Sequence, residues 1–149
     1  MAAGAWTVYN LAKKKLGNAT INLASNNFRC TLHTSASNAN TATLGVYQSV
    51  TNEVTEANGY SSSGKALTTR VWTVGASAGQ YKFDTDDVFW SANGGTIPNI
   101  KFAVISVSAA ATANRHLLCR SQLSSSQFTL SAGNRLTIQM NASGVLTLA

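Results

Sequence analysis

Apolar and polar residues alternate with a period of two along much of this 149-residue chain. In "FRCTLHT", Phe28, Cys30 and Leu32 alternate with polar or basic residues, which predicts a strand buried on one face. The run "KFAVISVSA" is more uniformly apolar and predicts a central strand. Further strands are predicted for the segments "ALTTRVWTV", "QYKF", "DVFW", "HLLCRSQL", "QFTLS", "NRLTIQM" and "GVLTLA".

Clusters of Gly, Asn and Ser separate these segments. They include "SNAN", "EANGYSSSG", "GASAG", "SANGG", "SAGN" and "NASG". Strands of about four to eight residues that alternate with such turns are typical of all-β proteins, and we expect a β-sandwich of the jelly-roll type. The closing segment "TIQMNASGVLTL" predicts a hairpin at the end of the chain.

The pattern changes to helical spacing only near the start, in "TVYNLAKKKLGN". Apolar residues recur there at intervals of three and four from Val8 to Leu16. Thr7 is a suitable N-cap, the lysines fall in the last turns, where they favour the helix dipole, and Gly17 is a typical stop. One short N-terminal helix is therefore predicted, and it must pack against the sheet to be stable.

The length of the chain predicts a single domain over residues 1–149, without internal repeats. Within it we expect an N-terminal arm and helix at 1–19 and a main strand region at 65–149. Residues 34–64 are rich in Ser, Asn and Thr and predict an extended loop or arm. Long loops in compact domains are usually functional or disordered, so we expect this segment to contact a neighbouring molecule.

The composition is 44% hydrophobic but only 11% charged, against about 25% charged residues in typical soluble domains. The polar surface must therefore consist mainly of Ser, Thr, Asn and Gln. A surface with so few charges does little to keep molecules apart, because exposed charges are what usually protects strand edges from association. We expect a homo-oligomer, either a dimer or a trimer.

The formal net charge of +6 arises from 11 basic and 5 acidic residues, so it reflects a scarcity of acids. The only basic cluster consists of Lys13, Lys14 and Lys15. Nucleic-acid binding needs several basic residues on one surface, often interleaved with aromatic residues, and the sequence does not favour it. The expected partner of the positive charge is an acidic protein surface.

The two cysteines, Cys30 and Cys119, lie far apart in separate strand-like segments. They form neither a metal half-site nor a disulfide framework, and we expect free, buried thiols in a reducing compartment. The start of the chain lacks a secretory pattern, and no apolar run approaches the roughly 18 residues that cross a membrane. We therefore expect synthesis in a cytoplasm and no membrane partner.

Asp84, Asp86 and Asp87 form the densest group of acids, in "YKFDTDDVFW". The calcium-loop template fails here, because it places Val88 at a ligand position and Gly95 where a bidentate glutamate belongs. The aspartates are too close together to face each other across a glycan. We expect them to shape a turn by bonding to nearby backbone, and a non-standard cation site stays open.

No catalytic motif is present. His33 and His116 both lie in strand patterns, and no serine belongs to a nucleophile elbow. Dinucleotide-binding, phosphate-binding and zinc-protease motifs do not occur. The sequence predicts that the protein is not an enzyme and uses no cofactor or small-molecule substrate, and apart from the open cation site at the aspartates it assigns no metal ligand.

Aromatic residues supply candidate contacts. Phe89 and Trp90 are adjacent in a predicted strand, so one should be buried and the other should face outward. Exposed Trp and Tyr residues are frequent anchors in protein interfaces. The candidate partner-binding residues are Trp6, Tyr9, Lys13, Lys14, Lys15, Tyr47 and Trp72.

Four segments together resemble small virion structural proteins of tailed bacteriophages, the capsid decoration or cement proteins. They are "YNLAKKKLGNATINLASNNFRCTLHTS", "GYSSSGKALTTRVWTV", "FDTDDVFWSANGGTIPNIKFAVI" and "FTLSAGNRLTIQMNASGVLTLA", and they cover nearly the whole chain. Phe102 stands where a tyrosine is common in that family. The resemblance implies that Tyr60, Gly64 and Leu67 lead into a strand pair. It also implies that Asp86, Trp90 and Ile97 hold a turn against the sheet.

The same resemblance implies the function and the location. The partner would be the major capsid protein, on the outer surface of an icosahedral head, and the chain would be made in the cytoplasm of the host bacterium. Its role would be to stabilise the junctions between capsomers. The alternative is an adaptor protein of the tail, collar or fibre base, including one that binds the host surface.

Overall fold

The computed structural model describes residues 4–149, so the first three residues of the predicted arm at 1–19 lie outside the described part. Strands make up 37% of the chain and helices 10%, which confirms the prediction of a mostly β protein with one short N-terminal helix. Several antiparallel sheets form it. No helix within residues 4–149 has the length and apolar character needed to cross a membrane.

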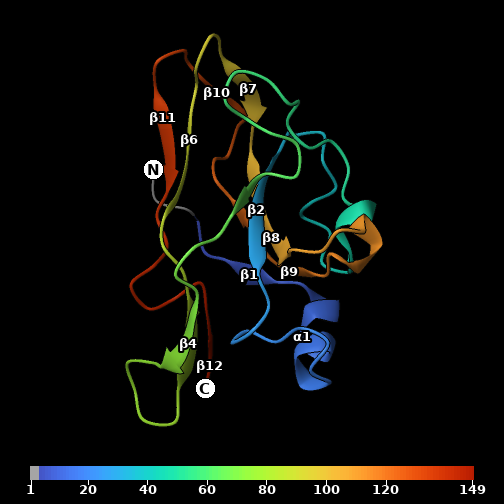
Figure 1. Cartoon of the computed structure of the whole chain (residues 1–149), viewed down its shortest axis with the longest axis vertical. Coiled ribbons are helices and arrows are strands. Elements are labelled where there is room, and N and C mark those ends of the chain that lie inside the picture. Colours follow the sequence, from blue (N-terminus) through green and yellow to red (C-terminus); the bar gives the residue numbers. More distant parts are fainter. Residues whose placement is uncertain (1–3) are drawn as a thin grey trace.

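The strands are short, and from β3 onward they follow one another closely along the chain (Figure 1). Those in the first half are β1 (Thr7–Val8), β2 (Phe28–His33), β3 (Lys65–Ala66), β4 (Val71–Val74), β5 (Tyr81–Asp84) and β6 (Val88–Ser91). Those in the second half are β7 (Ile97–Ile100), β8 (Phe102–Val107), β9 (Leu117–Gln122), β10 (Phe128–Leu130), β11 (Arg135–Ile138) and β12 (Leu146–Leu148). The helix is α1 (Asn10–Gly17), and two 3-10 turns are η1 (Tyr47–Ser49) and η2 (Thr112–Asn114).

The largest sheet has the strand order β1-β9-β8-β2-β3. Strand β8, predicted to be central, lies in its middle, and all six of its residues are buried. Two pairs, β10 with β7 and β11 with β6, and a three-stranded sheet in the order β12-β5-β4 complete the architecture.

Residues 81–107 run antiparallel to residues 117–148 as one long, interrupted hairpin. The pairs β8/β9, β7/β10, β6/β11 and β5/β12 follow one another along it, and backbone hydrogen bonds continue between them. Ala92 N donates to Asn134 O at 2.9 Å, and Leu123 N donates to Lys101 O at 2.9 Å. This long-range pairing spans most of the height of the molecule in Figure 1.

The predicted hairpin at the end of the chain is wrong. Strand β11 pairs with β6, where Leu136 lies opposite Trp90, and β12 pairs with β5, where Leu146 lies opposite Phe83. Both of these pairs are buried. Pairing with distant strands buries more apolar surface than a local hairpin could, and the local pattern does not reveal it.

The helix begins later than predicted. Thr7 is not its N-cap, because Thr7 and Val8 pair with Arg120 and Cys119 as strand β1 at the edge of the large sheet. Helix α1 therefore starts at Asn10, after the extended N-cap residue Tyr9, which makes no side-chain capping hydrogen bond, and ends at Gly17 as predicted. The sequence does not show that β9 has an unpaired edge. Thr7 and Val8 pair with that edge instead of joining the helix.

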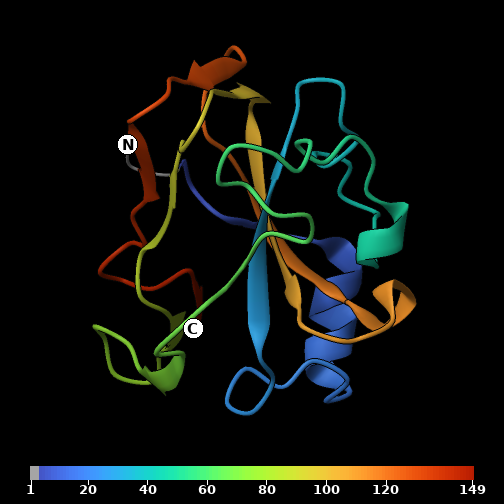
Figure 2. The same cartoon turned by 45° about the horizontal axis from the view of Figure 1, so that its top comes forward.

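Strand β2 is buried on both faces apart from Arg29, not on one face as predicted. Residues 34–64 fold back along it: Val54 N donates to Leu32 O at 2.9 Å, and His33 forms an isolated bridge with Glu53. In Figure 2 the first part of this excursion (residues 34–64) lies on the side of the five-stranded sheet away from β11, and its end crosses back toward β6, where Asn93 N donates to Asn58 O at 2.8 Å. It is thus packed against the sheet rather than projecting as an arm.

One hydrophobic core joins these parts. The rings of Phe28 in β2 and Phe83 in β5 lie 4.9 Å apart between centroids, which connects the five-stranded and three-stranded sheets. Tyr60 of the excursion packs against Trp90 of β6, with their ring centroids 6.1 Å apart. Trp90 is fully buried whereas Phe89 is 39% exposed, so the predicted split of this aromatic pair is confirmed.

Candidate interaction surface

The three consecutive lysines on helix α1 have two different roles. Lys13 and Lys14 are exposed to solvent. The Lys15 Nζ donates to Gly45 O at 3.1 Å and lies 2.7 Å from His116 Nδ1. Burial lowers the pKa of Lys15, and burial together with the Lys15 charge lowers the pKa of His116. Lys15 thus ties the helix to the excursion, and Lys13 and Lys14 are the pair that projects.

Tyr9 is a correction to the predicted contact set, because its side chain is fully buried. Its hydroxyl donates to Ala39 O at 2.6 Å, and the Arg120 guanidinium lies 4.9 Å from its ring centroid. Burial raises the pKa of this phenol. Trp6 is partly buried against the core. Tyr9 therefore anchors the start of the helix to the protein interior.

Tyr47 is half-buried in the excursion, where it shares the carboxylate of Glu53 with Tyr60. The Tyr47 hydroxyl donates to Glu53 Oε2, Tyr60 donates to Glu53 Oε1 at 2.6 Å, and Ser63 N donates to the same oxygen at 2.8 Å. Burial raises the pKa of both tyrosines, and the Glu53 charge adds to the effect. Arg115 lies 5.4 Å from the Tyr47 ring centroid. This cluster fastens the excursion internally.

Trp72 lies on strand β4 and stacks on Tyr81 of β5, with ring centroids 5.9 Å apart and planes 24° apart. The register places Trp72, Phe83 and Leu146 in one cross-strand row that packs toward the core. The next row on the same face is Val74, Tyr81 and Leu148, which we call the outer row. Its members are 59%, 47% and 50% exposed.

The helix and the three-stranded sheet meet around Leu16 and Leu148. A cavity of about 450 Å³ there is lined by Lys13, Leu16 and Leu148, among others. A second hollow of about 220 Å³ shares Leu16 and Leu148 and includes Trp72. The structure thus brings Lys13 and Trp72 into one region. Tyr47 belongs to a different region, beside Arg115 and the Glu53 cluster.

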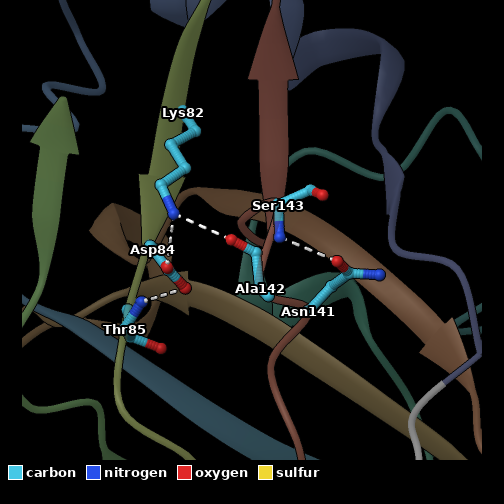
Figure 3. Close-up of polar contacts among 6 residues, drawn as sticks. All are labelled: Lys82, Asp84, Thr85, Asn141, Ala142 and Ser143. Carbon is cyan, nitrogen blue, oxygen red and sulfur yellow. Dashed lines mark hydrogen bonds and ion pairs between the residues drawn. The ribbon is translucent and has the colours of Figure 1, made fainter. Parts of the chain in front are cut away.

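Asp84 shapes the turn after β5, as predicted. Its Oδ1 accepts a hydrogen bond from Thr85 N at 3.0 Å, and its Oδ2 pairs with Lys82 Nζ at 3.2 Å (Figure 3). The same Lys82 Nζ donates to Ala142 O at 2.8 Å, in the loop before β12. In the close-up, Lys82 reaches from β5 toward both acceptors, so this group joins the two halves of the long hairpin.

The other two aspartates bond to separate partners. Asp86 accepts from the hydroxyls of Thr68 and Thr69, and Asp87 Oδ1 accepts from Met140 N at 2.8 Å. Asp87 therefore bonds across the hairpin rather than within its own turn. Within residues 4–149, no three His, Cys, Asp or Glu side chains are grouped so that they could hold a metal ion.

All five acidic side chains accept internal hydrogen bonds, since Glu56 accepts from Ser62 N at 2.9 Å. Lys82 and Asp84 form the only ion pair in the described part of the chain. The other basic side chains have no carboxylate partner there. The surface therefore keeps its excess of positive charge, which can attract an acidic macromolecule over roughly a Debye length.

The thiols and one of the histidines are buried inside the sheet. Cys30 and Cys119 are free and fully buried, and burial raises the pKa of both thiols. His33 Nε2 lies 2.9 Å from Thr31 Oγ1, and burial lowers the pKa of the imidazole. Reaction at these three side chains would require a substrate to enter the packed core.

Comparison with known proteins found no matching family model, curated protein or solved structure. The function must therefore be argued from the surface itself. Sequence reasoning missed the outer row, whose three members come from three different strands. Only the strand register shows that they are neighbours, although Tyr81 and the apolar "VWTV" run are visible in the sequence.

Proposed function

We propose that the protein is a capsid decoration or cement protein, which binds the outside of an icosahedral bacteriophage head and stabilises the junctions between capsomers. The observation that carries this proposal is that the basic side chains largely lack acidic partners within the protein. The five acids are occupied by internal hydrogen bonds, and Lys82 alone among the basic residues of the described chain has an acidic partner. Such a surface suits an acidic partner.

The exposed pair Lys13 and Lys14 is the proposed centre of the contact with the major capsid protein. Helix α1 has no acid in its first turn, and its basic residues cluster toward the end. Electrostatic attraction steers association and fixes orientation more than it adds affinity. Tight attachment would then come from many subunits acting together on one shell, because linked weak contacts give high avidity.

The proposed architecture is a β-sandwich of the jelly-roll type. The contact between Phe28 and Phe83 supports it, because it joins two sheets across a shared core. The long hairpin of 81–107 with 117–148 supports it as well, since jelly rolls are built from antiparallel strands divided between two packed sheets. Such a rigid body would present its loops and edges to neighbours on the shell.

The proposal is tested by charge reversal at the helix. The variant K13E/K14E should bind purified capsids that lack the protein with at least about tenfold lower affinity, and binding of the wild type should weaken as salt is added. The matched control is K65E/K101E, which makes the same change in net charge on β3 and before β8. Circular dichroism must show that both variants fold. Equal binding by both variants would contradict a contact through the helix.

A further inference from the structure

The three-stranded sheet β12-β5-β4 ends in an unprotected edge. Among the described residues no strand pairs with the outer side of β4. Its sequence, "VWTV", contains no charge and no proline, and its pairing with β5 has no bulge. Natural sheets usually protect an exposed edge with one of these devices, because its free backbone groups can pair with another chain.

The hydrogen-bonding groups available on this edge can be assigned. Gly75 N donates to Gln80 O at 2.7 Å, so the backbone of Gly75 points toward β5. Backbone groups alternate in direction along a strand, and the groups of Thr73 and Val71 therefore also point toward β5. The amides and carbonyls of Trp72 and Val74 point outward, where a partner strand would lie.

The charge of this sheet selects the partner. Lys82 and Asp84 are its only charged side chains, and they pair with each other at 3.2 Å. An acidic capsid surface would gain nothing from this neutral patch. A second copy of the chain would, because the patch offers apolar side chains and a strand edge that can pair with itself.

We propose that β4 pairs with β4 of a second copy, antiparallel, across a two-fold axis at Thr73. Trp72 then exchanges backbone hydrogen bonds with Val74 of the second copy, and the reverse exchange completes the pair. Residues directly opposite lie on the same face, so the Trp72 and Val74 side chains of both copies gather on one side. Each outer row of Val74, Tyr81 and Leu148 then continues into the row of Trp72, Phe83 and Leu146 of the other copy, within one six-stranded sheet.

This pairing goes beyond the proposed function, because it concerns two copies of the chain and involves neither the capsid nor the lysines. It also restricts the oligomer to a two-fold arrangement, since pairing of one edge with itself closes after two subunits. Failure of this inference would therefore leave the capsid contact untouched. A capsid contact that failed would likewise leave the dimer intact.

The test is the mass of the purified full-length protein in solution, measured by analytical ultracentrifugation over a concentration series. The wild type should reach twice the 15.6 kDa chain mass as concentration rises. V74K should raise the dimer dissociation constant at least about tenfold, because it places a charge in the apolar row of each copy. V74P should do the same by removing an outward N–H, a change that an edge strand tolerates.

The matched control is T147K, which adds the same charge to an exposed position on the other face of β12. It should dimerise like the wild type, and thermal unfolding must show that all variants fold. A wild type that stays monomeric at all concentrations would overturn the proposal. So would a folded V74K that dimerises normally, or a trimer, or a β4 edge that associates only with the capsid protein.

Discussion

Tyr60 donates a 2.6 Å hydrogen bond to Glu53, and this pair joins the excursion to the core. The same Tyr60 hydroxyl accepts from Leu32 N at 3.0 Å on strand β2, while its ring packs against Trp90. Glu53 in turn bridges to Tyr47 and Ser63. A segment without regular strands is thereby fastened to strands β2 and β6.

Loss of the Glu53 carboxylate should destabilise the fold. Glu53→Ala removes the short acceptor of the buried Tyr60 hydroxyl and leaves it only Leu32 O at 3.5 Å, and we expect a loss of about 2–4 kcal/mol in the free energy of unfolding. The control Glu56→Ala removes an exposed carboxylate that accepts only from Ser62 N, and it should cost less than about 1 kcal/mol. Urea denaturation measures both. Similar losses for the two variants would contradict the anchoring role of Glu53.

Stability should fall in mild acid because of His33. Burial lowers the pKa of the folded His33 below the value of about 6.5 in the unfolded chain, although the Glu53 charge partly offsets this. The unfolded chain then binds the proton more readily than the folded protein does. The contribution of neutral His33 to stability is therefore fully present above about pH 6.5. It is lost progressively as the pH drops below that value.

The difference between unfolding free energies at pH 7.5 and pH 5.5 measures this effect. His33→Gln should reduce that difference, whatever its effect on stability at neutral pH. The comparison variant is His116→Asn, because His116 is half-buried and its pKa is also lowered, first by burial and then by Lys15. His116→Asn should reduce the difference between the unfolding free energies at pH 7.5 and pH 5.5 by less than His33→Gln does. If that difference is unchanged in His33→Gln, the pH dependence arises elsewhere.

Gly64 should be irreplaceable for a steric reason. Its φ is +64°, and a Cβ at this position would lie 1.9 Å from Cys30 O on strand β2. Gly64→Ala should therefore cost more than about 3 kcal/mol or prevent folding. Gly133 has a similar φ of +81° but open space around it, so Gly133→Ala should cost only about 1 kcal/mol. Equal effects in thermal unfolding would show that close approach to β2 is not the cause.

The two thiols should report on unfolding. Cys30 and Cys119 are fully buried on either side of Ile105 in neighbouring strands, and burial raises the pKa of each thiol. We expect a thiol reagent to react slowly with the folded protein at pH 8 and rapidly in denaturing urea. Rapid reaction of either cysteine in the absence of denaturant would contradict its place in the core.

Much of the strand pattern could be predicted from the sequence, because local alternation reflects burial. Strand β8, which is apolar except for Ser106, is the central strand of the largest sheet, and adjacent Phe89 and Trp90 divide between surface and core. Partners of strands could not be predicted in this way. Leu136 of β11 pairs with Trp90 of β6 rather than with a residue of the adjacent strand β12. Such pairing depends on apolar surface that is distant in the sequence.

The candidate surface was only partly predictable for the same reason. Lys13 and Lys14 project, as their place on a polar helix face suggests, but Tyr9 is held inside by Ala39 O. The outer row depends on the register of β4, β5 and β12. Val74 and Leu148 both lie opposite Tyr81, although they are far apart in the chain.

The proposed role requires attachment to the phage head in many copies. Its most direct test is the number of these chains per major capsid protein in purified particles, measured by quantitative mass spectrometry. A decoration protein should be present at about one chain for every one or two capsid subunits, as the symmetry of the shell requires. A ratio of only a few hundredths, on the order of one ring per particle, would contradict the account and place the protein in the tail or collar.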